Sequence, residues 1–159
     1  MTPRPLPSLV AAIVALALVA TGPLIGLDVT RSAPDSFGEG DATVAAVDID
    51  DSELRVTAGR FGTDVSYLRV PTARVTVDEV TGRPRLVYLV AVPSAGIDLV
   101  STALVTEPAQ TYAVDPGDQG IESGSLERGT ITATVTVRVQ SFSVDRTVTR
   151  QNVTVEVQA

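Results

Sequence analysis

Closely spaced acidic residues are the first feature of this sequence that could do chemistry. The segment VDIDDSE contains Asp48, Asp50, Asp51 and Glu53. On a strand, Asp48 and Asp50 would share a face, and with Asp51 at a turn they could converge on Ca²⁺, which takes about six to eight oxygen ligands. The spacing does not match an EF-hand loop. We therefore interpret these residues as solvated surface acids and keep a metal or small-ligand site on them as an alternative.

Two further groups of charged residues have the same two interpretations. The segment DPGDQGIE offers Asp115, Asp118 and Glu122, again without EF-hand spacing. Arg83 and Arg85 flank Pro84 and could bind an anionic partner through paired N–H groups. Cross-strand pairing with the abundant acids is the simpler reading of these arginines.

The residue types that are missing exclude most catalytic mechanisms. The chain has no Cys and no His, and all twelve positive side chains are Arg, so Lys is absent as well. Thiol and imidazole catalysis, the usual zinc sites, Schiff bases and P-loop chemistry are therefore excluded. A carboxylate-only glycosidase would need two acids across a sugar cleft, and such clefts usually offer aromatic platforms, yet the chain has no Trp. We predict that the protein is not an enzyme and uses no cofactor.

One sequon is present. Asn152-Val153-Thr154 matches the N-x-[ST] pattern, and Asn152 is the only Asn in the chain. In an exported protein this Asn is a candidate glycosylation site. The alternative is an Asn tolerated at an irregular point of a Thr-rich strand, where the third-position Thr follows from composition.

Branched residues and alternation predict an all-β domain. Val and Thr dominate over three Phe and three Tyr, and branched side chains favour strands. We expect an antiparallel β-sandwich of about seven to eight strands with an immunoglobulin-like layout, preceded by one hydrophobic helix. The expected strands are 43–49, 54–58, 64–70, 73–80, 85–92, 97–106, 130–141 and 144–157.

Periodicity refines several of these strands. The stretch 86–92 is apolar on both faces, which predicts a central strand, whereas 130–141 alternates apolar residues with Thr and is expected to be half buried. The valines of 144–157 change phase, which predicts a β-bulge near Arg150–Asn152. Thr81-Gly82 predicts a hairpin between the strands on either side.

Two segments are less regular. The segment 97–106 also fits a helical spacing, although we expect a strand. The segment 108–129 is rich in Gly and Pro and predicts a long loop around one short strand at 112–114.

The N-terminus contains an uncharged stretch from Leu9 to Leu27, which is 19 residues long. A bilayer core needs about 17–25 apolar residues, so we predict a membrane anchor in residues 1–27. Arg4 precedes the stretch and acids follow it, so the positive-inside rule places the remainder outside the cell. A cleaved signal peptide is the alternative, because Leu9–Ala20 suits its apolar region although the small-residue cleavage pattern is poor. Residues 28–41 read as a flexible linker and 42–159 as the exported domain.

Charge indicates the environment. The net charge is −7 and the isoelectric point is near 4.5, which argues against nucleic acid as a partner. Zero Lys with abundant acid is similar to the bias of extreme halophiles, although GC-rich coding also favours Arg over Lys. The whole layout resembles small haloarchaeal membrane-anchored proteins that carry one exported β-sandwich of unassigned function. The resemblance implies an envelope location and no particular activity.

These observations predict a non-enzymatic, single-pass membrane protein whose extracytoplasmic β-sandwich acts by contact in the cell envelope. A Ca²⁺- or small-ligand-binding exported domain is the alternative. The expected contact surfaces are the strand edge at 144–157 and the loop at 108–129. The membrane itself is the expected partner of Leu9–Leu27.

Overall fold

The computed structural model describes residues 38–59, 65–122 and 126–158, all within a compact unit formed by residues 35–159. These residues form an all-β fold, as predicted, with ten strands in two sheets and two short 3-10 turns. The ten strands exceed the predicted number. The strands are β1 (Gly40–Asp48), β2 (Arg55–Ala58), β3 (Val65–Arg69), β4 (Ala73–Gly82), β5 (Arg85–Val92), β6 (Ile97–Leu104), β7 (Gln110–Val114), β8 (Gln119–Glu122), β9 (Gly129–Gln140) and β10 (Asp145–Gln158). The 3-10 turns are η1 (Asp51–Glu53) and η3 (Pro93–Ala95).

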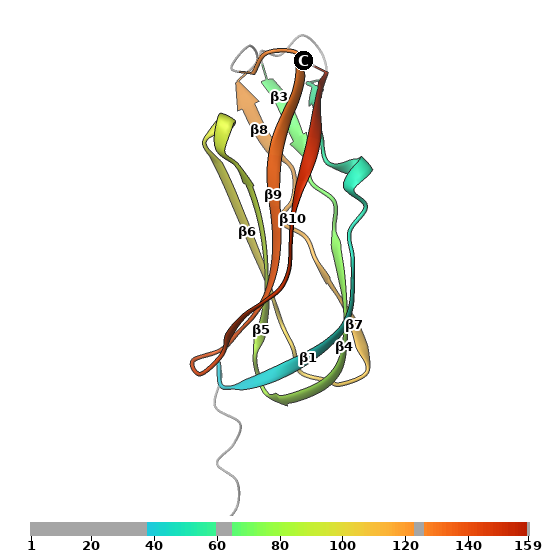
Figure 1. The fold of residues 1–159 in the computed structure, drawn as a ribbon, viewed down its shortest axis with the longest axis vertical. Helices are drawn as coiled ribbons and strands as arrows, with labels where there is room; N and C mark the ends of the chain where they lie inside the picture. Colours follow the sequence, from blue (N-terminus) through green and yellow to red (C-terminus); the bar gives the residue numbers. More distant parts are fainter. Residues whose placement is uncertain (1–37, 60–64, 123–125, 159) are drawn as a thin grey trace, which may run out of the picture. The chain divides into compact units, whose positions relative to one another are not determined.

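The two sheets differ in size. The smaller has the strand order β1-β4-β7, and the larger has the order β6-β5-β9-β10-β2-β3-β8 (Figure 1). Neighbouring strands are antiparallel, except that β2 runs parallel to the end of β10 through the pairs Arg55↔Glu156 to Thr57↔Gln158. β2 follows β1 directly in the chain, yet β1 belongs to the smaller sheet and β2 to the larger.

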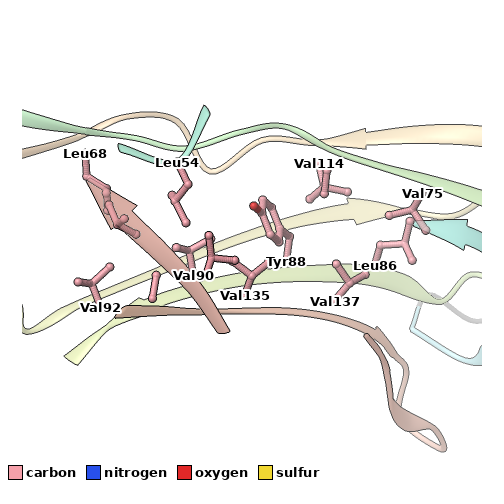
Figure 2. Close-up of a cluster of buried hydrophobic side chains, with 14 of the residues drawn as sticks. Leu54, Leu68, Val75, Leu86, Tyr88, Val90, Val92, Val114, Val135 and Val137 are labelled. Atoms are coloured by element: carbon pink, nitrogen blue, oxygen red, sulfur yellow. The ribbon is translucent and has the colours of Figure 1, made fainter. Parts of the chain in front are cut away.

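The core lies between the sheets and is made almost entirely of branched aliphatic residues. β4 contributes Val75 and Val77, and β9 contributes the alternating set from Ala133 to Val139. Tyr88 on β5 is the largest fully buried side chain and lies among the aliphatic residues in Figure 2. β5 pairs with β6 and β9 on its two sides, is fully buried on one face and is partly exposed at Leu89 and Ala91 on the other, so it is a central strand of the larger sheet, as predicted.

The β9–β10 hairpin is the longest pairing in the fold. Along β9 the apolar residues from Ala133 to Val139 are buried, whereas the alternating Thr residues are exposed or partly exposed, which confirms the predicted half-buried strand. A bulge does occur in β10, but it lies at Val148, between the pairs Thr147↔Arg138 and Thr149↔Val137. The predicted position near Arg150–Asn152 was therefore displaced by a few residues. Thr149 and Gln151 lie on the same face of β10 as the buried Val153. Because both are polar, the pattern of apolar residues did not show that the change of face occurs before Thr149.

The predicted hairpin at Thr81-Gly82 is wrong. β4 belongs to the smaller sheet and β5 to the larger, so the connection crosses between sheets. Pro84, which has no N–H to donate to a ladder, lies in this crossing. Gly82 has φ +64 and faces Gly40 in the register with β1, and a Cβ on Gly40 would lie 1.7 Å from the carbonyl oxygen of Thr81. The glycine that indicated a hairpin turn is therefore used for close approach of β1 and β4.

Two irregular segments are also settled by the structure. The ambiguous segment 97–106 contains strand β6, as expected. The segment 108–129 is not a long loop around one strand, because it supplies both β7 and β8. β7 pairs with β4 in the smaller sheet and β8 pairs with β3 in the larger. Its Gly and Pro residues mark the step from one sheet to the other, with Gly117 at φ +75 between the two strands.

The described residues contain no helix long and apolar enough to cross a membrane. The predicted anchor Leu9–Leu27 and the expected helix lie outside the described residues. β1 begins at Gly40, two residues before the predicted start of the domain.

Candidate functional site

The acidic segment, residues Asp48–Glu53, connects β1 to β2 over one edge of the sandwich. Asp50 is the N-cap of η1, and its Oδ1 atom accepts hydrogen bonds from the backbone N of Ser52 at 3.0 Å and from Ser52 Oγ at 2.5 Å. These bonds lower the pKa of the Asp50 carboxyl below its ordinary value. A general acid at neutral pH needs a raised pKa, so Asp50 acts here as a cap.

The remaining acids of the segment do not converge with Asp50. Asp51 Oδ1 accepts a hydrogen bond from Gln151 Nε2 at 2.7 Å, which ties η1 to β10. Asp48 and Asp51 line a common hollow that Asp50 does not line. No three acidic side chains among the described residues are grouped so that they could hold a metal ion. The Ca²⁺ alternative therefore gains no support from this part of the chain.

The other charged groups are used mainly within the fold. Asp118 forms an ion pair with Arg69, and its Oδ1 also accepts from the backbone N of Val70 at 3.3 Å. Asp115 Oδ1 accepts from the backbone N of Gly117 at 2.8 Å and so stabilises the turn between β7 and β8. Arg85 donates to Gln140 across the β5–β9 pair rather than to an acid.

The outer side of β10 is the longest open strand edge near the acidic segment. β9 pairs with β10 from Asp145 to Val157, whereas β2 pairs with its other side through only Glu156–Gln158. In the described part of the chain, no strand pairs with that second side between Asp145 and Val155. We call this side of Asp145–Val155 the β10 edge. The β10 edge covers most of the stretch 144–157 that the sequence predicted as a contact edge. The last residues of that stretch are paired with β2.

Two hollows lie beside the acidic segment, the smaller against the β10 edge and the larger at its end, where β2 begins to pair with β10. The smaller, of about 160 Å³, is lined by Val47, Asp48, Ile49, Asp51, Thr149 and Gln151. The larger, of about 520 Å³, is lined by residues of η1 and β2 and by Thr154, Glu156 and Gln158 of β10. Both linings are rich in polar side chains that can donate and accept hydrogen bonds.

Asn152 lies on the exposed face of β10. Its Oδ1 accepts a hydrogen bond from Thr134 Oγ1 of the paired strand at 3.1 Å. A sugar on Asn152 would project from the outer face of the larger sheet, because Val153 and Val155 point into the core on the alternate positions.

A second surface was missed by sequence reasoning. Phe142, at the tip of the β9–β10 hairpin, is 84 % exposed and lies beside a hollow of about 300 Å³. The hollow is lined by Gly38, Arg83, Arg85, Leu104, Gln140, Ser141 and Phe142. We call these seven residues the entry face, because the chain enters the described domain at Gly38. An aromatic residue between two serines in a turn, where polar residues are expected, was the available signal.

No family model, curated protein or solved structure matches this chain.

Proposed function

We propose that the protein is a non-enzymatic, single-pass membrane protein whose extracytoplasmic β-sandwich is a structural or interaction module of the cell envelope. The uncharged stretch Leu9–Leu27 would hold the domain at the membrane, with the domain outside. Release after signal cleavage is the alternative location. The acid excess and the absence of Lys support a halophilic setting.

An immunoglobulin-like layout is part of this proposal. β1-β4-β7 would correspond to strands A, B and E, and β6-β5-β9-β10 to strands C′, C, F and G. Tyr88 is then buried on strand C, the position that antibody domains fill with Trp. β3 and β8 extend the larger sheet beyond β2. Domains of this layout serve recognition through loops and edges on many proteins, which agrees with a role in contact.

The β10 edge is the observation that carries the proposal. Unpaired backbone N–H and C=O groups along a strand are a template for another extended segment. The two polar hollows beside the edge would receive alternate side chains of such a segment. Arg146 and Arg150 limit indiscriminate pairing, because charged side chains on an edge oppose aggregation.

Fractionation of cells that express the full chain, with mass spectrometry of the intact protein, tests the location. We expect the product in the membrane fraction at its full mass, with any glycan on Asn152 as added mass. A full-length product free in the cytosol would overturn the proposal. A shortened product outside the cell would support the cleaved alternative.

Photo-crosslinking in intact cells tests the contact role. A photoreactive residue at Arg150, exposed on β10, is expected to yield crosslinked envelope protein. The matched control is the same probe at Asp98, exposed on β6 at the far edge of the larger sheet. Equal yields at the two positions would remove the β10 edge as the contact surface.

A further inference from the structure

Phe142 is held outward by an ordered turn. Ser141 N donates to the carbonyl oxygen of Val144 at 2.7 Å, and Ser141 Oγ accepts from the backbone N of Ser143 and Val144 at 3.2 and 3.0 Å. The backbone at the hairpin tip is therefore fixed on both sides of Phe142. Its 84 % exposure is a property of the folded hairpin. A large exposed aromatic side chain costs solvation free energy, so a surface that covers it is favoured.

The same residue is fastened to the point where the chain enters the domain. Phe142 N donates to the carbonyl oxygen of Gly38 at 2.6 Å. Gly38 has φ +85, and a Cβ there would lie 2.9 Å from Cε2 of the Phe142 ring. Glycine suits this position, because a side chain would be strained at that φ and would crowd the Phe142 ring, and the hydrogen bond holds the hairpin tip beside the entering chain. Figure 1 shows the start of β1 beside the β9–β10 turn.

The charged residues of the entry face are both Arg. The Arg85 guanidinium donates from Nε and Nη2 to Gln140 Oε1 at 3.0 and 2.6 Å. This acceptor is neutral, so it fixes the orientation of the Arg85 guanidinium without pairing it with a carboxylate, and three of the five N–H groups of Arg85 are left for another acceptor. Leu104, 43 % exposed, adds apolar surface to the same hollow. The two hollows beside the acidic segment, in contrast, are lined by acids as well as Arg55.

We propose that the entry face docks on the anionic headgroup surface of the membrane that holds Leu9–Leu27. This inference rests on the proposed anchoring. Arg85 would bind a lipid phosphate through its remaining N–H groups, and Phe142 and Leu104 would enter the boundary between headgroups and acyl chains. The domain would then stand on the membrane with a fixed end toward the lipid.

The length of the connecting chain supports this occupant. Ten residues, 28–37, separate the predicted anchor from Gly38, and an extended chain of that length spans at most about 35 Å. With Leu9–Leu27 in the bilayer, the entry face would stay within that reach of it, and tethering would raise its effective concentration there. A contact that would be weak for two free molecules is then sufficient.

Tryptophan fluorescence can test the docking directly, because the chain has no Trp of its own. The full-length Phe142→Trp variant is reconstituted into vesicles of phosphatidylcholine with phosphatidylglycerol, some of them brominated near the headgroup end of the acyl chains. We expect emission at shorter wavelength and loss of most of the fluorescence to the brominated lipid. The control is Val100→Trp, since Val100 is 58 % exposed on β6 outside the entry face; its emission should stay that of a solvated indole.

A charge pair of variants tests the headgroup contact. In the Phe142→Trp protein, Arg85→Gln should reduce quenching in vesicles that contain phosphatidylglycerol. The control is Arg74→Gln, which also removes one positive charge. Arg74 lies at the start of β4, whereas the entry face lies beyond the end of this strand, so quenching should be unchanged. Circular dichroism confirms that each variant keeps its β-sheet content.

The outcomes separate the two proposals. If the protein floats with the vesicles but Phe142→Trp emits like Val100→Trp, the docking is wrong and the anchor stands. A shifted emission without quenching would mean that Phe142 is covered by protein, either a second copy or a partner, and would also overturn the docking. If the full chain does not float with vesicles, the anchoring and the docking both fall.

Discussion

Tyr88 carries a hydroxyl group that the core encloses without a hydrogen-bond partner. The side chain is fully buried, and the described residues offer its Oη atom neither donor nor acceptor. In Figure 2 the ring lies among aliphatic side chains from both sheets. A buried polar group without a partner costs about 1–3 kcal/mol of stability.

Tyr88→Phe should therefore raise the free energy of unfolding by about 1 kcal/mol, because it removes the unsatisfied hydroxyl and keeps the ring. Urea unfolding followed by circular dichroism measures the change. A loss of stability would show instead that a buried water satisfies the hydroxyl group.

The same residue should make the stability of the fold depend on pH in the alkaline range. Burial, and then the negative charges of Asp51 and Asp115, raises the pKa of Tyr88 to about 12. In the unfolded chain the pKa is about 10, so the unfolded state releases this proton first as pH rises. The contribution of Tyr88 to stability is complete below pH 10 and is lost as the pH rises toward 12. The loss amounts to about 2–3 kcal/mol.

Unfolding by urea at a series of pH values should show this loss in the wild type and not in Tyr88→Phe. The comparison is unusually clean because the chain has no Lys, His or Cys, and the other two tyrosines are common to both proteins. Parallel pH curves for the two proteins would contradict the prediction.

Single residues were the hardest features to predict from the sequence. The acids at 48–53 were correctly identified as a cluster along the chain, yet Asp50 caps η1 while Asp51 binds Gln151, one hundred residues away. Sequence spacing cannot indicate which acids share a space when their partners come from distant strands. Phe142 was overlooked because its importance depends on the position of Gly38, which the sequence does not place.

At the scale of elements, the β10 edge makes a specific prediction for hydrogen exchange. In an antiparallel ladder, alternate residues exchange both of their hydrogen bonds with the partner strand, and the residues between them point their N–H groups the other way. β2 accepts those groups only at 156–158. From Thr149 to Val155, therefore, every second amide should exchange rapidly.

Exchange of backbone amides followed by NMR would show this alternation in β10, with protection at successive residues only near Glu156–Gln158. β9, which lies between β5 and β10, serves as the internal control and should be protected at successive residues from Thr134 to Val139. Uniform protection from Thr149 to Val155 would mean that the edge is covered, and the proposed contact surface would then be lost.

Strand positions followed from the sequence much better than strand pairing. Alternation located most strands within a few residues, because burial of one face imposes a period of two. Pairing depends on which sheet each strand joins, and a turn signal such as Thr81-Gly82 is the same for a hairpin and for a crossing between sheets. The parallel pairing of β2 with the end of β10 joins segments about one hundred residues apart and has no local signal.

At the scale of the whole molecule, charge should make stability depend on salt. The chain has 19 acids against 12 Arg, and the ion pairs Arg69–Asp118, Arg138–Asp145 and Arg146–Asp41 are all between partly exposed side chains. Such exposed pairs contribute about 0–1 kcal/mol each. The chain keeps a net charge of −7, and its self-repulsion acts through solvent and is therefore open to screening.

The urea midpoint should accordingly rise with NaCl, and most steeply at low concentration, because the screening length falls from about 10 Å at 0.1 M to about 3 Å at 1 M. A triple variant with Asp48→Asn, Glu79→Gln and Asp98→Asn, all at exposed positions, lowers the net charge from −7 to −4 and should show a smaller rise. A salting-out effect on the core would instead continue to grow above 1 M and would be equal in both proteins. Equal curves would therefore show that acid repulsion does not govern the stability of this fold, and the halophilic interpretation of the composition would lose its physical basis.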